Sequence, residues 1–211
     1  MAQATSKATA VGGESPTNGA AEEIGFEEPY FVTVTIRGTA AILFHAWNNE
    51  SVAAKSAAAK NSKAKKSDDV ESYVYRTPDG DIAIPGTYLK GSLCDPQKGA
   101  AKFLQDPRSP RKSALDLFKA GVIVTTEYAS LGKADWDYLD RRRVVIQRSA
   151  VTRERPAFLA GWEATFEVMV QTPEYISQDM LHHVLVNAGR LVGVGDFRPT
   201  YGRFSVVKFE G

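Results

Sequence analysis

Arginine and aromatic side chains are concentrated in two short stretches of this sequence. Six arginines lie within the fifteen residues 141–155, interleaved with β-branched residues. A second stretch, 191–204, combines three glycines with two arginines, two phenylalanines, a tyrosine and a proline. Guanidinium groups bind phosphates and aromatic rings stack on bases, so this composition fits contact with a nucleic-acid strand. The alternative is that the arginines only pair with nearby acids such as Asp137, Asp140 and Glu154.

The predicted contacts to nucleic acid comprise these arginines, one tyrosine and one lysine at the start of a predicted helix, where backbone N–H groups favour anions. They are Lys90, Arg141, Arg142, Arg143, Arg148, Arg153, Arg155, Arg198, Tyr201 and Arg203. Gly193, Gly195 and Gly202 are expected to let the backbone approach the strand closely. The alternative for the glycines is a tight connection between a helix and a strand.

His45 is the weak candidate for acid–base chemistry. In a metal-independent ribonuclease it would act as general base on a 2′-OH, with a lysine or arginine stabilising the phosphorane. Lone histidines are more often structural, so we expect a binding protein rather than an enzyme.

No cofactor or metal ion is expected. His182 and His183 are adjacent on a predicted helix and so face different directions. The single cysteine, Cys94, excludes a disulfide and a cysteine-rich metal site. The segment 193–195 lacks the third glycine and the preceding strand of a dinucleotide fingerprint.

Length, hydrophobic content and net charge are those of a chain with one compact core and no excess of charge. It has 211 residues, 43% of them hydrophobic, and a formal net charge of +1. Any nucleic-acid surface must therefore come from local segregation of charge. The N-terminus lacks the apolar region of a signal peptide, and no run approaches the length of a membrane span. We expect a cytoplasmic protein without a membrane partner.

Hydrophobic patterning divides the chain into a tail and one domain. Residues 1–27 are expected to be a disordered tail, because they cannot bury enough surface to offset chain entropy. Residues 28–211 form the predicted domain, with a Lys/Ala-rich insertion at 47–72 and a basic β-ribbon at 138–160. Other predicted elements are a strand over 30–45 bent near Gly38, a hairpin over 73–84, a helix capped by Thr87, a restart capped by Asp95, a helix over 114–121, a strand over 122–124, a strand over 162–170, a helix capped by Ser177 and a strand over 204–209.

Without the insertion and the ribbon, these elements follow the order β-α-β-β-α-β. This order is that of ferredoxin-like (RRM-like) α+β domains, whose sheet can serve as a platform for nucleic acid. Nucleotide-cofactor loops follow the first strand of their fold, whereas the glycine stretch follows the second helix.

Two motifs and one position resemble the RAMP superfamily, which includes backbone subunits of CRISPR effector complexes. Ile84-Pro85-Gly86-Thr87-Tyr88-Leu89-Lys90-Gly91 is similar to its motif at the first helix, and 193–202 lies where it keeps a glycine-rich loop. The arginines of 141–155 fall where backbone subunits project a hairpin "thumb", and His45 falls where some RAMP-type nucleases carry a catalytic histidine. The ending GVGDFRPTYGRF also resembles uncharacterised phage or prophage proteins.

The resemblance implies sequence-independent binding of single-stranded RNA or DNA, often as a head-to-tail filament. Our first hypothesis is therefore a non-catalytic binding protein for single-stranded nucleic acid that forms a homo-oligomer. One alternative is a metal-independent endoribonuclease centred on His45. Another is a phage structural or inhibitory protein that joins a host nucleoprotein complex and so has host or phage protein partners.

Overall fold

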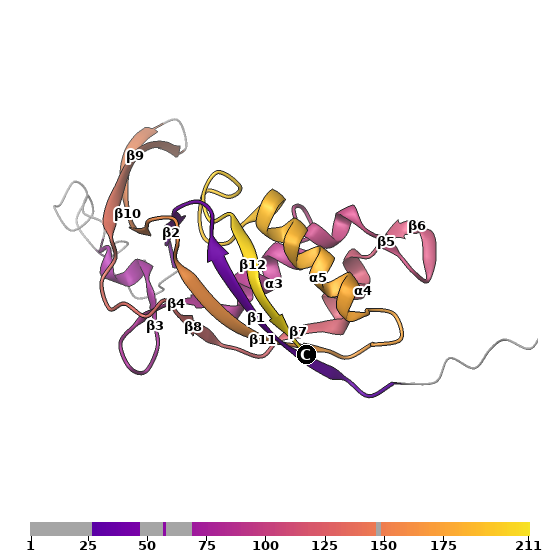
Figure 1. The fold of residues 1–211 in the computed structure, drawn as a ribbon. Helices are drawn as coiled ribbons and strands as arrows, with labels where there is room; N and C mark the ends of the chain where they lie inside the picture. Colours follow the sequence, from indigo (N-terminus) through magenta and orange to yellow (C-terminus); the bar gives the residue numbers. More distant parts are fainter. Residues whose placement is uncertain (1–26, 47–56, 58–68, 147–148) are drawn as a thin grey trace, which may run out of the picture.

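The computed structural model describes residues 27–46, 57, 69–146 and 149–211 as a mixed α+β structure with antiparallel sheets (Figure 1). The predicted tail and most of the Lys/Ala-rich insertion lie outside these residues. Three α-helices are present in the described part: α3 (Gly86–Cys94), α4 (Leu115–Gly121) and α5 (Gln178–Asn187).

The main sheet has four strands in the spatial order β12-β1-β11-β7, and every neighbouring pair is antiparallel. Its strands are β1 (Tyr30–Gly38), β7 (Val122–Val124), β11 (Glu163–Val170) and β12 (Phe204–Glu210). Along the chain, α3 and α4 lie between β1 and β7, and α5 lies between β11 and β12. The β-α-β-β-α-β order predicted from the sequence is therefore confirmed.

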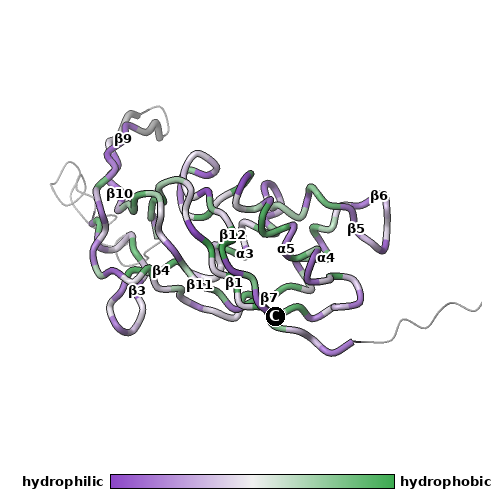
Figure 2. Tube along the Cα trace, viewed as in Figure 1, coloured by the Kyte–Doolittle hydropathy of each residue, from purple (hydrophilic) through white to green (hydrophobic). Residues whose placement is uncertain are grey.

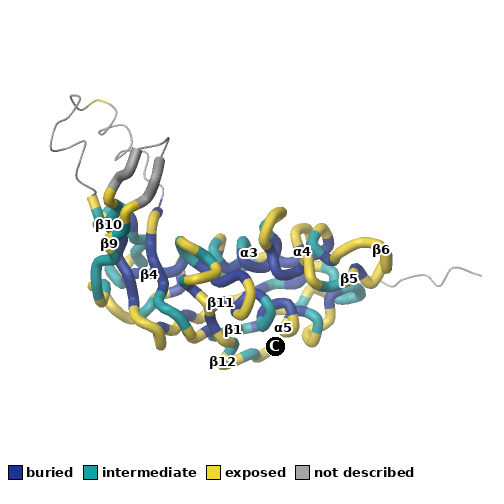
Figure 3. The backbone as a smooth tube through the Cα atoms, turned by 90° about the horizontal axis from the view of Figure 1, so that it is seen from above, coloured by how far each residue is buried: buried dark blue, intermediate teal, exposed yellow. Residues whose placement is uncertain are grey.

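Alternation of side chains in β1 and β11 places one face of this sheet in the core. Val32, Val34 and Ile36 are buried, as are Phe166 and Val168 of the neighbouring strand. The intervening residues face outward, so the strands have one apolar and one polar face. Figure 3 shows that burial is concentrated in the sheet and the segments packed on it, whereas the peripheral hairpin of β5 (Gln105–Asp106) and β6 (Ser109–Ser113) is largely exposed.

The predicted long strand over 30–45 is two strands in different sheets. β1 ends at Gly38, and β2 (Ile42–Leu43) pairs with the ribbon instead. A Cβ at Gly38 would lie 2.1 Å from the indole nitrogen of Trp162, and that nitrogen donates to the Ala40 carbonyl at 2.9 Å. The indole therefore occupies the corner at which the chain leaves the main sheet.

The ends of two helices test the predicted caps. Ser177 caps α5, because its hydroxyl accepts the Met180 N–H. The prediction for Thr87 is wrong: α3 begins at Gly86 with Pro85 as its N-cap, and no side chain caps it. The fixed φ of proline suits the extended residue that precedes a helix.

The predicted restart of the helix at Asp95 is wrong, although Asp95 does cap a turn there. Its carboxylate accepts the backbone N–H groups of Gln97 and Lys98, which lowers the pKa of Asp95. The turn leads to the 3₁₀ helix η2 (Ala100–Phe103) and not into a further α-helix.

The basic ribbon is present as β9 (Tyr138–Ile146) and β10 (Ser149–Phe158), which pair in register along their length. Strand β2 joins its root and connects it to the body of the protein. In Figure 1 the hairpin projects from the upper left of the domain, and Figure 2 shows its hydrophilic character against the apolar central strands.

Smaller elements complete the fold. The predicted hairpin over 73–84 is confirmed as β3 (Tyr75–Arg76) and β4 (Ile82–Pro85), preceded by η1 (Glu71–Tyr73) and extended by β8 (Tyr128–Ser130). Strands β5 (Gln105–Asp106) and β6 (Ser109–Ser113) form a second hairpin. A π-helical turn, η3 (Ala188–Val192), leads from α5 into the glycine stretch.

Candidate nucleic-acid interface

The root of the ribbon and the glycine stretch contact each other. The guanidinium carbon of Arg142 lies 4.6 Å from the ring centroid of Tyr201 and 5.9 Å from that of Phe197. From β10, Arg155 lies 4.5 Å from the Phe197 ring. Because cation–π contacts operate within about 6 Å, both arginines stack on the loop. Two stretches about fifty residues apart thus meet in one surface, here called the ribbon–loop surface. It comprises Phe197, Arg198 and Tyr201 of the loop, Arg142, which stacks on them, and Arg141 and Arg143, which alternate with Arg142 along β9 and so project from the other face of the ribbon.

Acidic partners hold some of the ribbon arginines. Arg141 pairs with Glu154 at 2.8 Å across the strands, and Arg142 pairs with Asp140 at 2.6 Å. Both side chains therefore have acidic partners of the kind that the ion-pair alternative expected. The Arg141 side chain is 67% exposed, and exposed pairs contribute only about 0–1 kcal/mol, so a phosphate can compete for this arginine.

Arg143 and Arg198 differ from these paired arginines. Their side chains have no hydrogen bond or ion pair to the described residues. Arg153 lies directly opposite Arg142 in the β9–β10 register, and Arg148 lies outside the described residues. Arg143 and Arg198 are thus the guanidinium groups most readily available to a ligand on this surface.

Arg155 has a structural position. Only 7% of its side chain is exposed, and its Nε donates to the Asp196 carboxylate at 2.6 Å. Its Nη1 has no hydrogen-bond partner among the described residues. The structure does not bring Arg155 to the surface as the sequence predicted; the residue fastens the ribbon root to the glycine loop from beneath.

The glycines of the loop are required by the loop's own packing. Gly202 donates its N–H to the Ala41 carbonyl at 2.8 Å, and Asp196 donates to Leu43 at 2.9 Å. A Cβ at Gly202 would lie only 1.6 Å from the Val194 carbonyl oxygen. The tight-connection alternative therefore accounts for Gly202, although the loop also carries Phe197, Arg198 and Tyr201 on its outer side.

Replacing Gly202 with alanine is expected to lower the free energy of unfolding by about 3 kcal/mol. The substitution adds a backbone clash to the strain of a positive φ, 72°. Gly132→Ala is the matched control, because its φ is 68° but a Cβ there meets nothing within 4 Å. Urea denaturation should show a loss of about 1 kcal/mol for the control; equal losses would contradict the clash.

A small hollow of about 160 Å³ opens beside the loop. It is lined by His45, Thr87, Tyr88, Gly91, Gly195, Asp196 and Arg198. Burial raises the pKa of Tyr88, so its phenol stays protonated and can donate a hydrogen bond. The hollow therefore contains donors, a cation and a carboxylate within reach of a strand lying on the ribbon–loop surface.

His45 is held at the edge of this hollow. Its Nδ1 lies 3.9 Å from an Asp196 carboxylate oxygen, and its ring packs edge-on against Tyr73 with centroids 4.5 Å apart. Because Nδ1 faces the Asp196 carboxylate, Nε2 points away from that carboxylate. The structure thus places the one predicted acid–base group next to the predicted binding arginine Arg198.

Lys90 is used inside the fold. Its ammonium donates to the carbonyl oxygens of Phe118 and Lys119, each at 3.0 Å, and to that of Val122. Because an ammonium has three N–H groups, none is left for a phosphate. Lys90 therefore binds the carbonyl groups at the end of α4 instead of making the predicted phosphate contact.

The Lys90→Met substitution is expected to lower the free energy of unfolding by about 2 kcal/mol and to leave nucleic-acid affinity unchanged. Methionine keeps the length of the side chain but leaves the carbonyls at the end of α4 without their donor. Chemical denaturation measures the first effect, with the exposed Lys119→Met as control. A large loss of affinity in a folded Lys90→Met protein would restore the predicted phosphate contact.

Arg203 lies at the far end of the glycine loop from Arg198. Its carbonyl accepts N–H groups from Thr39 and Ala40 at 2.8 and 3.3 Å, which fixes the backbone there. Its side chain is exposed beside Arg190, a residue of η3 that the sequence patterns did not single out.

The open face of the main sheet does not resemble a nucleic-acid platform. Its central positions include Thr33 and Thr35 on β1, opposite Glu167 and Thr165 on β11. Arg37 on this face is paired with Glu163. Threonines and carboxylates neither stack on bases nor attract phosphates, so these central positions do not form the expected platform.

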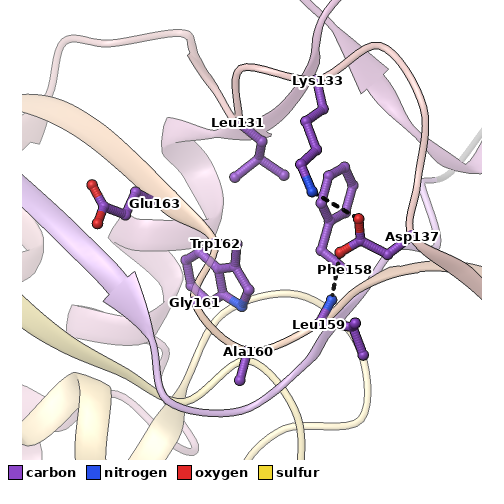
Figure 4. Close-up of a pocket in the computed structure, with 9 residues that line it drawn as sticks. All are labelled: Leu131, Lys133, Asp137, Phe158, Leu159, Ala160, Gly161, Trp162 and Glu163. Carbon is purple, nitrogen blue, oxygen red and sulfur yellow. Dashed lines mark hydrogen bonds and ion pairs between the residues drawn. The ribbon is translucent and has the colours of Figure 1, made fainter.

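A larger hollow of about 500 Å³ lies between β8 and the turn before β11 (Figure 4). Both Lys133 and Asp137 line it, and the Lys133 ammonium lies 2.8 Å from an Asp137 carboxylate oxygen. The same carboxylate accepts the Leu159 N–H. Asp137 is therefore engaged away from the ribbon arginines that it was expected to pair with. None of the predicted contact residues lines this hollow.

Within the described residues, no cluster of three histidine, cysteine, aspartate or glutamate residues could hold a metal ion, and Cys94 is a buried free thiol. No helix in this part of the chain is long and apolar enough to span a membrane.

Comparison with known proteins gives no sequence relative. No protein-family model matches the chain, and no curated protein matches it. Among solved structures, it is similar to the crystal structure of the Csm3-Csm4 subcomplex in the type III-A CRISPR-Cas interference complex. That match has a TM-score of 0.35 and 15% sequence identity, and it covers 88% of this chain and 77% of the other.

Proposed function

We propose that this chain is a RAMP-type protein that binds single-stranded RNA or DNA without sequence preference through the ribbon–loop surface. The observation that carries this proposal is the stacking of Arg142 on Tyr201 at 4.6 Å, which joins the ribbon to the glycine loop. Arginines supply contacts to phosphates, and the rings of Phe197, which is exposed, and Tyr201, which is partly exposed, supply faces for bases. The β-α-β-β-α-β order and the positions of both stretches in it support the RAMP assignment.

Single strands fit this surface better than duplexes. Its aromatic side chains can only stack on bases that are not already stacked in a helix, and Phe197 is 37% exposed. Base-independent stacking and phosphate contacts together give binding with little sequence preference.

Titration of labelled single-stranded oligonucleotides at about 50 and about 200 mM salt tests the proposal. Three phosphate contacts, from Arg142, Arg143 and Arg198, predict about a 20-fold loss of affinity over this range. Both RNA and DNA strands should bind, and duplex competitors should displace them poorly. Absence of binding at the lower salt concentration, or affinity independent of salt, would refute the proposal.

We further propose that copies of the protein assemble head to tail along the strand. The ribbon projects beyond the body of the domain, so it can reach a neighbouring copy on the same strand (Figure 1). Light scattering should report a monomer or small oligomer without nucleic acid, and growth with the length of an added oligonucleotide. A complex of constant protein mass at every length would contradict this assembly.

A second candidate function is metal-independent cleavage of RNA. It is favoured by the hollow that contains both His45 and Arg198, with Asp196 at 3.9 Å from His45 Nδ1. In this mechanism His45 removes the proton of a 2′-OH, the 2′-oxygen attacks the adjacent phosphorus, the 5′-oxygen leaves, and Arg198 stabilises the phosphorane.

Incubation of RNA in EDTA with the wild type and with His45→Ala decides between binding alone and cleavage. Cleavage that ends in a 2′,3′-cyclic phosphate and is lost with His45→Ala would establish the second candidate. DNA, which has no 2′-OH, should remain intact in the same experiment. Absence of cleavage, or equal cleavage by both proteins, removes this candidate and leaves the binding proposal intact.

A further inference from the structure

A second hollow with two arginines lies at the other end of the glycine loop. It has a volume of about 400 Å³ and is lined by Thr39, Val186, Gly189, Arg190, Arg203, Phe204, Ser205 and Val206. No acidic residue is among these lining residues. The hollow thus combines an apolar floor with a local charge of +2.

Neither arginine is neutralised by the described part of the protein. The side chains of Arg190 and Arg203 make no hydrogen bond or ion pair there. This distinguishes them from Arg141, Arg142 and Arg155, which all have acidic partners. Two neighbouring guanidinium groups without counter-charge form a ready binding site for an anion.

The backbone holds both arginines in place. Arg190 lies in the π-helical turn η3, in which Gly193 donates its N–H to the Ala188 carbonyl five residues back. At Gly189 a Cβ would lie 2.2 Å from the Phe204 carbonyl oxygen, so glycine is what lets this turn approach β12. π-helical turns are rare and occur frequently at functional sites.

The hollow is connected to the ribbon through a short run of backbone. Arg203 is hydrogen-bonded to Thr39 and Ala40, Gly202 to Ala41, and β2 begins at Ile42 and pairs with the ribbon root. The glycine loop lies along this run, with Arg198 and Tyr201 toward the ribbon and Arg203 toward the hollow. A strand that crosses the loop from the ribbon reaches Arg203 next.

We propose that Arg190 and Arg203 form a second nucleotide subsite, which binds a phosphate of the same single strand after it has crossed the glycine loop. The two guanidinium groups contact the phosphate, and the sugar or base lies on the apolar floor that includes Val206. This inference rests on the proposed function, and it adds Arg190 to the contacts. It also gives the strand a path across the end of the domain, from the ribbon to α5.

Binding of oligonucleotides of increasing length, from about 4 to about 16 nucleotides, tests the subsite. For the shortest strands that bind at all, the Arg190→Gln/Arg203→Gln protein should have the same affinity as the wild type. For longer strands it should lose about tenfold in affinity, and the slope of log K against log salt should fall by about 0.7, because one phosphate contact is lost. The control is Arg111→Gln/Lys112→Gln, which removes the same charge from exposed positions on β6.

The outcomes separate the subsite from the proposed function. Loss confined to the longer strands supports the subsite. The subsite alone is refuted if the wild type binds and the Arg190→Gln/Arg203→Gln protein loses no affinity at any length, or loses the same affinity at every length. It is also refuted if the control protein shows the same loss. If the wild type binds no strand of any length, the proposed function fails and the subsite fails with it.

Discussion

Replacing Arg143 and Arg198 together with glutamine is expected to lower the affinity for single-stranded nucleic acid by about 30-fold at low salt. The estimate assigns about 1 kcal/mol to each phosphate contact. The salt slope should fall by about 1.4, because two phosphate contacts are lost. Neither side chain has a hydrogen bond or ion pair to the described residues, so the fold should not be disturbed.

Fluorescence anisotropy with a labelled oligonucleotide measures this effect, and circular dichroism verifies the fold. The Arg111→Gln/Lys112→Gln protein again serves as the control of equal charge, because β6 lies at the opposite end of the domain from the ribbon (Figure 1). An equal loss in the control would mean that net charge, and not this surface, determines binding. An unchanged affinity in the Arg143/Arg198 variant would remove both residues from the interface.

The Asp196→Ala substitution is expected to lower the free energy of unfolding by about 3 kcal/mol. It leaves the guanidinium of Arg155, of which 7% is exposed, without its ion-pair partner at 2.6 Å. An unpaired buried charge is costly, whereas a well-packed apolar replacement of the whole pair is often neutral. The double variant Arg155→Met/Asp196→Ala should therefore be more stable than Asp196→Ala.

This rescue distinguishes an uncompensated charge from a loss of loop structure. Urea denaturation of the wild type, both single variants and the double variant gives the coupling energy of the pair. Equal stability of Asp196→Ala and the wild type would show that Arg155 does not depend on this carboxylate. A double variant less stable than either single variant would show that the two side chains act separately.

Local sequence patterns predicted the order of the elements well. Alternation in 30–38 and 163–170, helical spacing after Ser177 and the basic ribbon each involve neighbouring residues, so one stretch contains the whole signal. The wrong predictions came from tertiary contacts. The chain leaves the main sheet after Gly38 because the Trp162 ring occupies the corner, and no local pattern indicates that contact.

The sequence predicted which segments form the candidate site, but not the role of each side chain in it. Arginine density at 141–155 identified the ribbon, yet Arg155 is buried beneath the loop and Lys90 closes the end of α4. Burial of a charged residue depends on partners such as Asp196, which lies 41 residues away in the sequence. The sequence did not single out Arg190, because the helical pattern around it is apolar, and only the fold places it beside Arg203.

Photo-crosslinking tests the central claim most directly, namely that the ribbon–loop surface holds a single strand. Strands carrying photoreactive thio-pyrimidines would be irradiated with the protein, and the tryptic peptides mapped by mass spectrometry. We predict cross-links in peptide 191–203, which contains Phe197 and Tyr201, and a loss of these cross-links in the Arg143→Gln/Arg198→Gln protein. Cross-links that instead map to the open face of the main sheet, around Thr33 and Thr35, would contradict the account.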